Sequence, residues 1–177
     1  RAFGSWTNAG KPASRVFSSS EISFYYLKID GNFMDTGVNN PDLLYPEEVR
    51  KIIGCAMTVY NTLGIGFLEG VYQDALEVEF GLQGIPFEHK KHLDVYYKGV
   101  KLPGFFEADV VCYGKIILEL KAISRLTDID DAQLINYLKA TGIQAGILIN
   151  FGKKGKLEWK RFVYTNDLYF RKENVPK

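Results

Sequence analysis

The chain has 177 residues, which is enough for one ordinary domain with a single buried core. Hydrophobic residues make up 46% and aromatic residues 14% of the sequence, so the composition excludes an intrinsically disordered protein. The formal net charge of +1 gives no sign of nucleic acid as a partner, although one positive surface is enough to bind it locally. Because no apolar run approaches the roughly 20 residues of a membrane span, we expect a cytoplasmic protein without a membrane segment.

The first 40 residues differ in composition from the rest of the chain. Residues 1–20 contain no acidic side chain and are rich in Ser, Gly and Ala. The sequence therefore predicts a poorly ordered extension over residues 1–44, in which Ile22–Leu27 could form an accessory strand. One domain is expected over residues 45–170, followed by a C-terminal tail over residues 171–177.

Two helices are predicted at the start of this domain. An apolar face repeats at helical spacing from Pro46 onward, formed by Val49, Ile52, Ile53, Ala56, Met57 and Tyr60. Pro46 suits a first helical turn, and the two glutamates that follow it suit the positive end of the helix dipole. Gly64 and Gly66 end this helix, and a second helix is predicted from about Leu68 to Leu82.

Three strand-like segments follow, then a helix and two further strands. The predicted strands are His92–Tyr97, Val100–Val111 with an interruption at Pro103–Gly104, and Lys115–Lys121. A helix is predicted over Ile129–Ala140, a buried strand over Ala145–Asn150 and a final strand over Leu157–Tyr164. The order α-α-β-β-β-α-β-β predicts an α/β domain with a mixed sheet flanked by helices, and it fits a restriction-endonuclease-like αβββαβ core.

The second and third predicted strands carry charged residues at a few points in an otherwise apolar sequence. Asp109 lies on one strand, and Glu119 and Lys121 lie on the next. Alternation along a strand directs Glu119 and Lys121 to one face, where a hairpin can bring Asp109 beside them. Charges on strands that otherwise favour burial are costly, and a divalent metal such as Mg²⁺ would compensate for the carboxylates. The pattern favours metal-assisted phosphodiester cleavage, with a solvated surface ion-pair network as the alternative.

Cysteines and histidines give no independent sign of a site. Cys55 and Cys112 form neither a disulfide framework nor a metal-ligand spacing, and we expect free thiols. His89 and His92 would point to opposite faces of a strand, which is poor zinc geometry. A late basic cluster could contribute to a positive surface or be a solvated face, and it consists of Lys153, Lys154, Lys156, Lys160 and Arg161.

Several spaced motifs resemble one nuclease family. Asp109 followed by Glu119-x-Lys121 is similar to the signature of the PD-(D/E)XK nuclease superfamily, and residues 66–72 (GFLEGVY) resemble the motif of its GxxExxY family. Further similarities occur, in the same order, at residues 97–99, 108–109, 119–122, 133–138 and 149–152. Together they cover roughly residues 46–163.

The resemblance implies roles for particular residues. Asp109, Glu119 and the carbonyl of Leu120 would hold Mg²⁺, with Mn²⁺ as a substitute, and Lys121 would orient the attacking water or stabilise the developing charge. Gln133 would contact metal-bound water or substrate from the same helix face as Tyr137, which we expect to contact substrate.

Two residues of the second predicted helix have structural alternatives. Glu69 occupies the position from which superfamily members bring a glutamate to the metal, although it could simply complement the helix dipole. Tyr72, one turn later, could bind Glu69 or a phosphate, or merely pack.

The leading hypothesis is therefore a Mg²⁺-dependent nuclease that acts on nucleic acid, DNA more than RNA. The alternative is a non-catalytic nucleic-acid-binding or protein-binding module that has kept the fold, because a fold does not fix a function. Double-strand cleavage often uses two such sites, so a homodimer is among the expected states.

Overall fold

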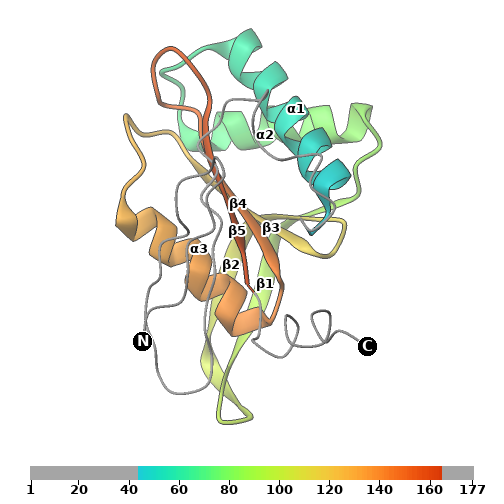
Figure 1. The fold of residues 1–177 in the computed structure, drawn as a ribbon, viewed down its shortest axis with the longest axis vertical. Helices are drawn as coiled ribbons and strands as arrows, with labels where there is room; N and C mark the ends of the chain where they lie inside the picture. Colours follow the sequence, from blue (N-terminus) through green and yellow to red (C-terminus); the bar gives the residue numbers. More distant parts are fainter. Residues whose placement is uncertain (1–43, 165–177) are drawn as a thin grey trace, which may run out of the picture.

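The computed structural model describes residues 44–164. The predicted N-terminal extension, with its accessory strand at Ile22–Leu27, lies outside the described residues, as does the C-terminal tail. The described part of the chain contains three helices and five strands in the predicted order (Figure 1). Their bounds are α1 Pro46–Leu63, α2 Glu69–Leu82, β1 Phe87–Tyr97, β2 Val100–Cys112, β3 Ile116–Lys121, α3 Asp128–Thr141, β4 Ala145–Asn150 and β5 Glu158–Val163.

The five strands form one mixed sheet in the order β1-β2-β3-β4-β5. Only β3 and β4 run parallel, and α3 provides the crossover between them. All other neighbours are antiparallel. This arrangement confirms the predicted α/β fold with a mixed sheet between helices.

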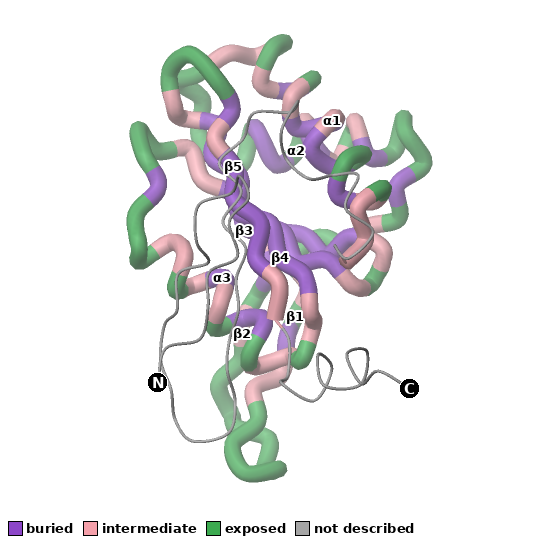
Figure 2. Tube along the Cα trace, in the orientation of Figure 1, coloured by how far each residue is buried: buried purple, intermediate pink, exposed green. Residues whose placement is uncertain are grey.

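Helices cover both faces of the sheet, as Figure 1 shows for α1 and α2 on one side and α3 on the other. Under α1 and α2, one core cluster contains Ile52, Leu76 and alternate β3 residues such as Leu118. Under α3, a second cluster contains Ile117, Leu134 and Leu148. The inner strands β3 and β4 are therefore buried on both faces, which explains their continuous apolar sequences (Figure 2).

Strand β2 separates from β3 partway along its length. The two strands pair only from Val110 to Cys112 of β2, whereas β2 pairs with β1 as far as Val100. Ala108 and Val111 both join the cluster under α3 although they are three residues apart, so the regular alternation of faces is broken at Asp109–Val110. Beyond this point β1 and β2 continue as a two-stranded hairpin.

Two details of this hairpin differ from the sequence-based prediction. β1 begins at Phe87, five residues before the predicted start at His92, because charged residues on an exposed strand conceal its period. Pro103–Gly104 does not end β2. Instead the pairing register shifts: Asp94 and Tyr96, two residues apart in β1, pair with Phe105 and Lys101, which are four residues apart in β2. None of the helices described over residues 44–164 is long and apolar enough to span a membrane.

Candidate active site

Strand β3 presents Glu119 and Lys121 on the α3 side of the sheet. Their neighbours Leu118 and Leu120 face the opposite cluster, as alternation requires. Glu119 is 2% exposed, and its Oε1 accepts a hydrogen bond from Lys121 Nζ at 2.5 Å. Its other oxygen, Oε2, is buried and has no hydrogen-bond partner. A buried carboxylate oxygen without a donor is rare and calls for a ligand or a proton.

Asp109 lies at the point where β2 separates from β3. Its Oδ2 accepts a hydrogen bond of 2.7 Å from the backbone N–H of Leu120, taking the place of the missing strand partner. Lys121 O bonds to Phe151 N on the β4 side, so in the alternating ladder the N–H and C=O of Leu120 face the β2 side. The Leu120 carbonyl is therefore directed toward the same opening as the Asp109 side chain.

The charges of this group influence one another. Burial, followed by the negative charges of Asp109 and Glu69, raises the pKa of Glu119 to about 7 against the opposing effect of Lys121. Burial also raises the pKa of Asp109, although the Leu120 amide and Lys121 oppose the shift. For Lys121, burial disfavours the ammonium, but the bond to Glu119 and the surrounding carboxylates more than offset this and raise its pKa. Negative charge is thus concentrated at Asp109, Glu119 and the neighbouring Glu69.

Glu69 approaches this group from the first turn of α2. The residue as a whole is exposed, but partial desolvation of its carboxyl group, with the Asp109 charge, raises its pKa. Lys121 and the backbone amide of Ala122 act in the opposite direction. The structure therefore brings Glu69 to the edge of the Asp109–Glu119–Lys121 group.

Helix α3 brings Gln133 and Tyr137 to the same side. Gln133 Nε2 donates to Tyr137 Oη at 2.9 Å, and the Tyr137 ring packs against Phe106 with centroids 4.7 Å apart. Burial raises the pKa of Tyr137, and the charges of Glu119 and Asp109 add to the shift. Both residues thus border the Asp109–Glu119–Lys121 group. The Tyr137 hydroxyl already accepts a hydrogen bond from Gln133.

The substrate-contact interpretation of Tyr72 is not supported by its position. Tyr72 is fully buried, its ring stacks on Phe151 with centroids 4.8 Å apart, and its hydroxyl donates to Gly64 O at 2.8 Å. The same hydroxyl accepts from Phe67 N at 3.3 Å. It therefore joins the α1–α2 connection to the core, and the packing alternative is favoured.

A second group of polar residues fixes the backbone that follows Lys121. Asn150 Oδ1 accepts from Ile123 N and Gly152 N, both at 3.0 Å, while Asn150 Nδ2 donates to Glu158 Oε2. Glu158 Oε2 also accepts from Leu126 N at 3.1 Å. A Cβ on Gly152 would lie 2.5 Å from backbone atoms of Ala122 and Ile123.

The sequence alone assigns neither Asn150 nor Glu158 a part in the site. The INFG sequence at residues 149–152 was the available signal. Its function in the structure is to hold the segment that leaves β3 immediately after Lys121.

The late basic cluster does not form one positive surface. Lys160 and Arg161 are only 6% and 2% exposed; Lys160 bonds to Asp131, and Arg161 donates to the carbonyl of Leu44. Lys153 is paired with Glu158. Lys160 and Arg161 point to opposite faces of β5, and both faces are covered, so only Lys154 and Lys156 of the cluster are exposed.

The two histidines have separate surroundings. His89 contacts Gln73 and Glu77 of α2, whereas His92 stacks on Phe105 and bonds to Asp94. Over residues 44–164, no three His, Cys, Asp or Glu side chains are arranged to hold a metal ion by themselves. A metal held by Asp109 and Glu119 would need further oxygen ligands such as the Leu120 carbonyl and water. The unpartnered Glu119 Oε2 and this all-oxygen donor set fit a hard divalent cation.

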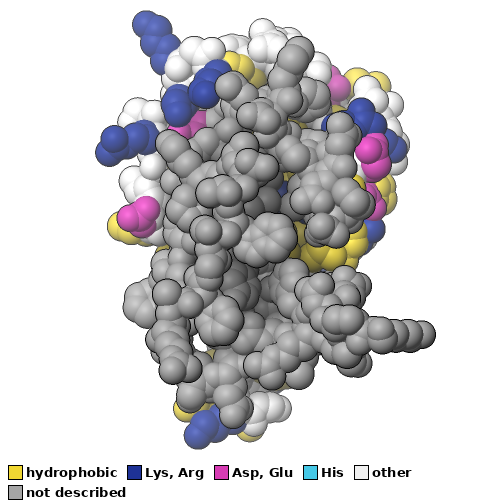
Figure 3. Space-filling view, viewed as in Figure 1, with side chains coloured by type: hydrophobic (Ala, Val, Ile, Leu, Met, Phe, Trp, Pro, Cys, Tyr) yellow, Lys and Arg dark blue, Asp and Glu magenta, His cyan; other side chains and the backbone are white. Residues whose placement is uncertain are grey.

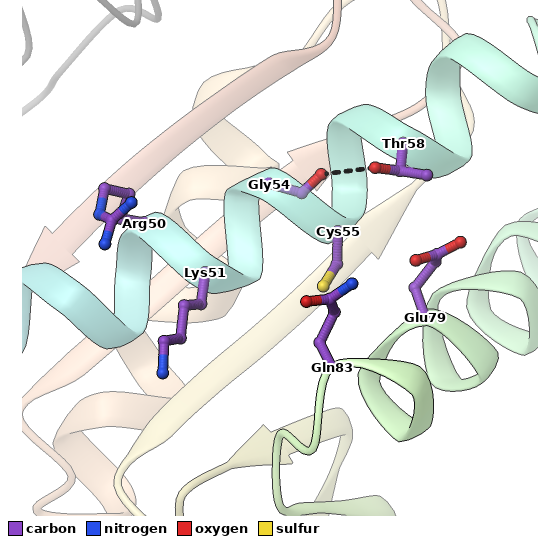
Figure 4. Close-up of a pocket in the computed structure, with 7 residues that line it drawn as sticks. All are labelled: Arg50, Lys51, Gly54, Cys55, Thr58, Glu79 and Gln83. Atoms are coloured by element: carbon purple, nitrogen blue, oxygen red, sulfur yellow. Dashed lines mark hydrogen bonds between the residues drawn. The ribbon is translucent and has the colours of Figure 1, made fainter.

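A pocket of about 300 Å³ lies elsewhere, between α1 and the end of α2 (Figure 4). Its lining includes Arg50, Lys51, Cys55, Glu79 and Gln83, and it contains none of the candidate metal-binding or catalytic residues. Arg50 is paired with Glu47, and the Glu79 carboxylate would repel an anion in this pocket. We therefore place the candidate site at Asp109, Glu119 and Lys121, on the face of the sheet that α3 covers.

One comparison with known proteins identifies the family of the chain. No curated protein matches the chain in sequence at a significant level. The solved protein SSO0001 is 17% identical with a TM-score of 0.44, over 75% of this chain and 71% of its own, and nothing is concluded from a likeness this weak. The family model described as the PD-(D/E)XK nuclease superfamily matches residues 46–162, which include all of the carboxylate group. The chain belongs to the PD-(D/E)XK nuclease superfamily.

Proposed function

We propose that this protein is a divalent-metal-dependent nuclease that hydrolyses phosphodiester bonds, DNA in preference to RNA, and that it belongs to the GxxExxY family. The observation that carries the proposal is the pair of carboxylates, Asp109 and Glu119, with an unpartnered buried oxygen next to Lys121. Membership in the superfamily supports a nuclease-type function and a nucleic-acid substrate.

Asp109, Glu119 Oε2 and the Leu120 carbonyl would hold the cation, with Mg²⁺ favoured by an all-oxygen donor set and Mn²⁺ as a substitute. When bound, such an ion neutralises phosphate charge and makes water a better nucleophile. The Leu120 N–H fixes the orientation of the Asp109 carboxylate through its 2.7 Å bond, so little reorganisation is needed on binding.

Lys121 is the proposed catalytic residue. Its ammonium is held 2.5 Å from Glu119 Oε1, and this bond keeps the charged form beside the phosphate position. From there it can donate a hydrogen bond to the attacking water or to a non-bridging phosphate oxygen. Glu69 would bring a further carboxylate toward the metal from the edge of the group. Gln133 would contact metal-bound water or substrate, and Tyr137 would contact substrate.

The proposal is tested by cleavage assays on single-stranded, duplex and branched DNA and RNA with Mg²⁺, with Mn²⁺ and with chelator. We expect DNA cleavage that chelator abolishes, and a loss of about a hundredfold or more in Lys121→Ala, the effect of removing one transition-state donor. Lys156→Ala, an exposed lysine of the β4–β5 turn, is the matched control. If Lys121→Ala cleaves at the wild-type rate, or no substrate is cut with either metal, the proposal is wrong and the binding-module alternative stands.

A further inference from the structure

The β1–β2 hairpin extends well beyond the rest of the sheet. We define the ribbon as residues 92–107, the part of the hairpin that lies beyond the pairing of β2 with β3. In Figure 1 it projects from the lower end of the molecule, and in Figure 2 its tip is exposed. The turn residues Lys98 and Gly99 have φ values of 49° and 79°, the left-handed pair of a type I′ turn, which gives the ribbon a defined register.

Large apolar side chains are exposed along this ribbon. Tyr96, Tyr97 and Phe105 are 56%, 62% and 54% exposed, and Val100 and Leu102 are exposed as well. At the base of the ribbon Leu93 and Phe106 pack under α3, and a two-stranded hairpin is only marginally stable by itself. Several exposed aromatic rings on one such element indicate a surface that contacts a partner.

The charge of the ribbon indicates the chemistry of that partner. Lys90 and Lys98 lie at the base and in the turn of the hairpin, whereas Lys91 is paired with Glu88 and Lys101 with Asp94. Figure 3 shows basic and apolar side chains together at the tip, where Lys98 Nζ lies 5.6 Å from the Tyr97 ring centroid. At the other end, Lys90 lies between His89 and Lys91, which pair with Val110 and Ala108 on either side of Asp109. Positive charge is therefore present at the tip of the ribbon and beside the candidate active site.

The same residues distinguish between forms of nucleic acid. Residues 92–107 contain no Arg, Asn or Gln, the side chains that most often read base edges in a duplex groove. They do contain exposed aromatic rings beside lysines, the combination that binds single strands by stacking on unpaired bases and contacting phosphates. Asp109 and Val100 are nine residues apart in β2, which at the rise of a strand is a distance of about 30 Å along the strand. The ribbon thus spans several nucleotides leading to the site.

We propose that the ribbon is a binding arm for unpaired nucleic acid, on which Tyr96, Tyr97 and Phe105 stack bases while the lysines contact phosphates. The inference rests on the proposed nuclease function, because it identifies single-stranded or branched nucleic acid as the substrate class of the same site. Strand binding along the ribbon would deliver the phosphate backbone toward Asp109 and Glu119.

The test measures fluorescence anisotropy of the full chain with a labelled thymidine 20-mer and with a 20-base-pair duplex, in chelator so that nothing is cut. We expect Tyr96→Ser/Tyr97→Ser to lower affinity for the single strand by about tenfold or more, as expected for lost base stacking. The control is Val78→Ser/Leu82→Ser, which removes similarly exposed apolar side chains (62% and 73%) from α2 and should leave affinity unchanged. Equal affinity of the ribbon variant and the wild type would overturn the inference.

A second variant reports on stacking directly. Tyr97→Trp should keep the affinity and show fluorescence quenching on binding the 20-mer beyond that of the wild-type tryptophans. Absence of additional quenching would contradict a single-strand arm. So would a greater loss of affinity for the duplex than for the single strand in Tyr96→Ser/Tyr97→Ser. A dimer in light scattering that only the ribbon substitutions dissociate would contradict it as well.

Failure of this inference is distinguishable from failure of the proposed function. If the wild type cleaves branched or single-stranded DNA and the ribbon variant does so with unchanged KM, only the arm is wrong. If the wild type binds through the ribbon but cuts nothing with Mg²⁺ or Mn²⁺, the arm stands and the nuclease proposal fails.

Discussion

Glu119 and Asp109 are two carboxylates held close together with too few hydrogen-bond donors for their oxygens. Lys121 satisfies one oxygen of Glu119 and the Leu120 amide satisfies one oxygen of Asp109, while Glu119 Oε2 has no partner. Burying charge in this way costs free energy, which explains the pKa of Glu119 of about 7. At the scale of single residues, the arrangement weakens the apo fold in favour of a ligand that supplies positive charge.

Asp109→Asn tests this balance. The amide keeps an oxygen for the Leu120 N–H but removes a negative charge next to Glu119, so the free energy of unfolding without metal should be unchanged or higher. Affinity for Mn²⁺ should fall by about tenfold or more, because a neutral oxygen attracts a hard cation less than a carboxylate does. Calorimetric titration and chemical denaturation of the same variant measure both effects. Wild-type Mn²⁺ affinity in this variant would remove Asp109 from the ligand set.

Glu158 gives a prediction of pH dependence away from the proposed ligands. Burial opposes its charge, but the bonds from Lys153, Asn150 and Leu126 N prevail and lower its pKa. A carboxyl group with a lowered folded-state pKa stabilises the fold above its unfolded pKa of about 4.3, and this contribution is lost as the pH falls. Glu158→Gln should therefore be less stable than wild type at pH 7, with the difference shrinking toward pH 3. Urea denaturation at pH 7, 5 and 3.5 checks this, and a constant difference would contradict it.

At the scale of elements, the turn after β4 sets the path of the segment after β3. Phe151 N donates to Lys121 O at 2.8 Å, Asn150 bonds to Ile123 N, and Gly152 packs directly against the Ala122–Ile123 backbone. Three consecutive residues of one turn thus locate the end of the strand that carries Lys121. The active-site side chains are held by this junction as well as by their own strands.

Gly152→Ala tests the junction. The new Cβ would lie 2.5 Å from backbone atoms, which cannot move aside as a flexible side chain could, so we expect a loss of about 1–3 kcal/mol in the free energy of unfolding. Cleavage should fall as well, because Lys121 is displaced. Gly54→Ala is the control: it lies in α1 with nothing within 4 Å of a new Cβ, and it should be neutral or up to about 1 kcal/mol stabilising. A Gly152→Ala protein with wild-type stability and cleavage would contradict this role.

The elements were predictable from sequence where a single period or a turn signal dominates. Pro46 and the apolar repeat located α1, and the continuous apolar run at residues 145–150 located β4, because a strand buried on both faces needs no alternation. β1 was predicted too short because its first five residues alternate little and are mostly exposed. Alternation along the strands and a hairpin also predicted that Asp109 would lie beside Glu119 and Lys121. In the structure the alternation breaks at Asp109–Val110, and Asp109 reaches this group through its bond to the Leu120 N–H.

Other features of the site depend on contacts between distant segments and have no local signal. The burial of Lys160 and Arg161 results from β5 lying beside β4, which a run of basic residues conceals. The hydroxyl of Tyr72 is engaged by Gly64 O and Phe67 N through the shape of the α1–α2 connection. Neither could be read from residue type or spacing, and the separation of β2 from β3 at Val110 is likewise visible only in the pairing.

At the scale of the whole molecule, both described cysteines are buried in the cluster beneath α1 and α2. Cys55 lies on α1 and Cys112 on β2, and burial raises the pKa of each thiol. Thiolates react, and thiols in such surroundings do not. Cys55 lines the pocket between α1 and α2, whereas Cys112 is fully buried and does not, so modification of Cys112 requires the fold to open.

The labelling rate of Cys112, measured in a Cys55→Ser protein, should consequently report on metal binding at the distant site. In native conditions we expect no fast reaction with an aromatic disulfide reagent, and the thiol should react in denaturant. Mn²⁺ at a hundred times its dissociation constant should slow the native reaction by about a hundredfold, because it binds the folded state only. Asp109→Asn should show little slowing at that concentration. Fast labelling of the native protein would mean that α1 opens independently of the rest.

The separation of β2 from β3 after Val110 has a consequence for how such a protein can change. Residues Val110 to Cys112 of β2 fix its register against β3, while the rest of β2 has β1 as its strand partner. A hairpin of different length or sequence can therefore be exchanged beyond Leu93 and Phe106, which pack under α3, without shifting the three pairings β2–β3, β3–β4 and β4–β5 or the carboxylates. Under the proposed function, the residues for hydrolysis and those for substrate preference lie on separate parts of β2, and grafting a foreign hairpin between Asp94 and Phe105 should change substrate preference while cleavage is kept.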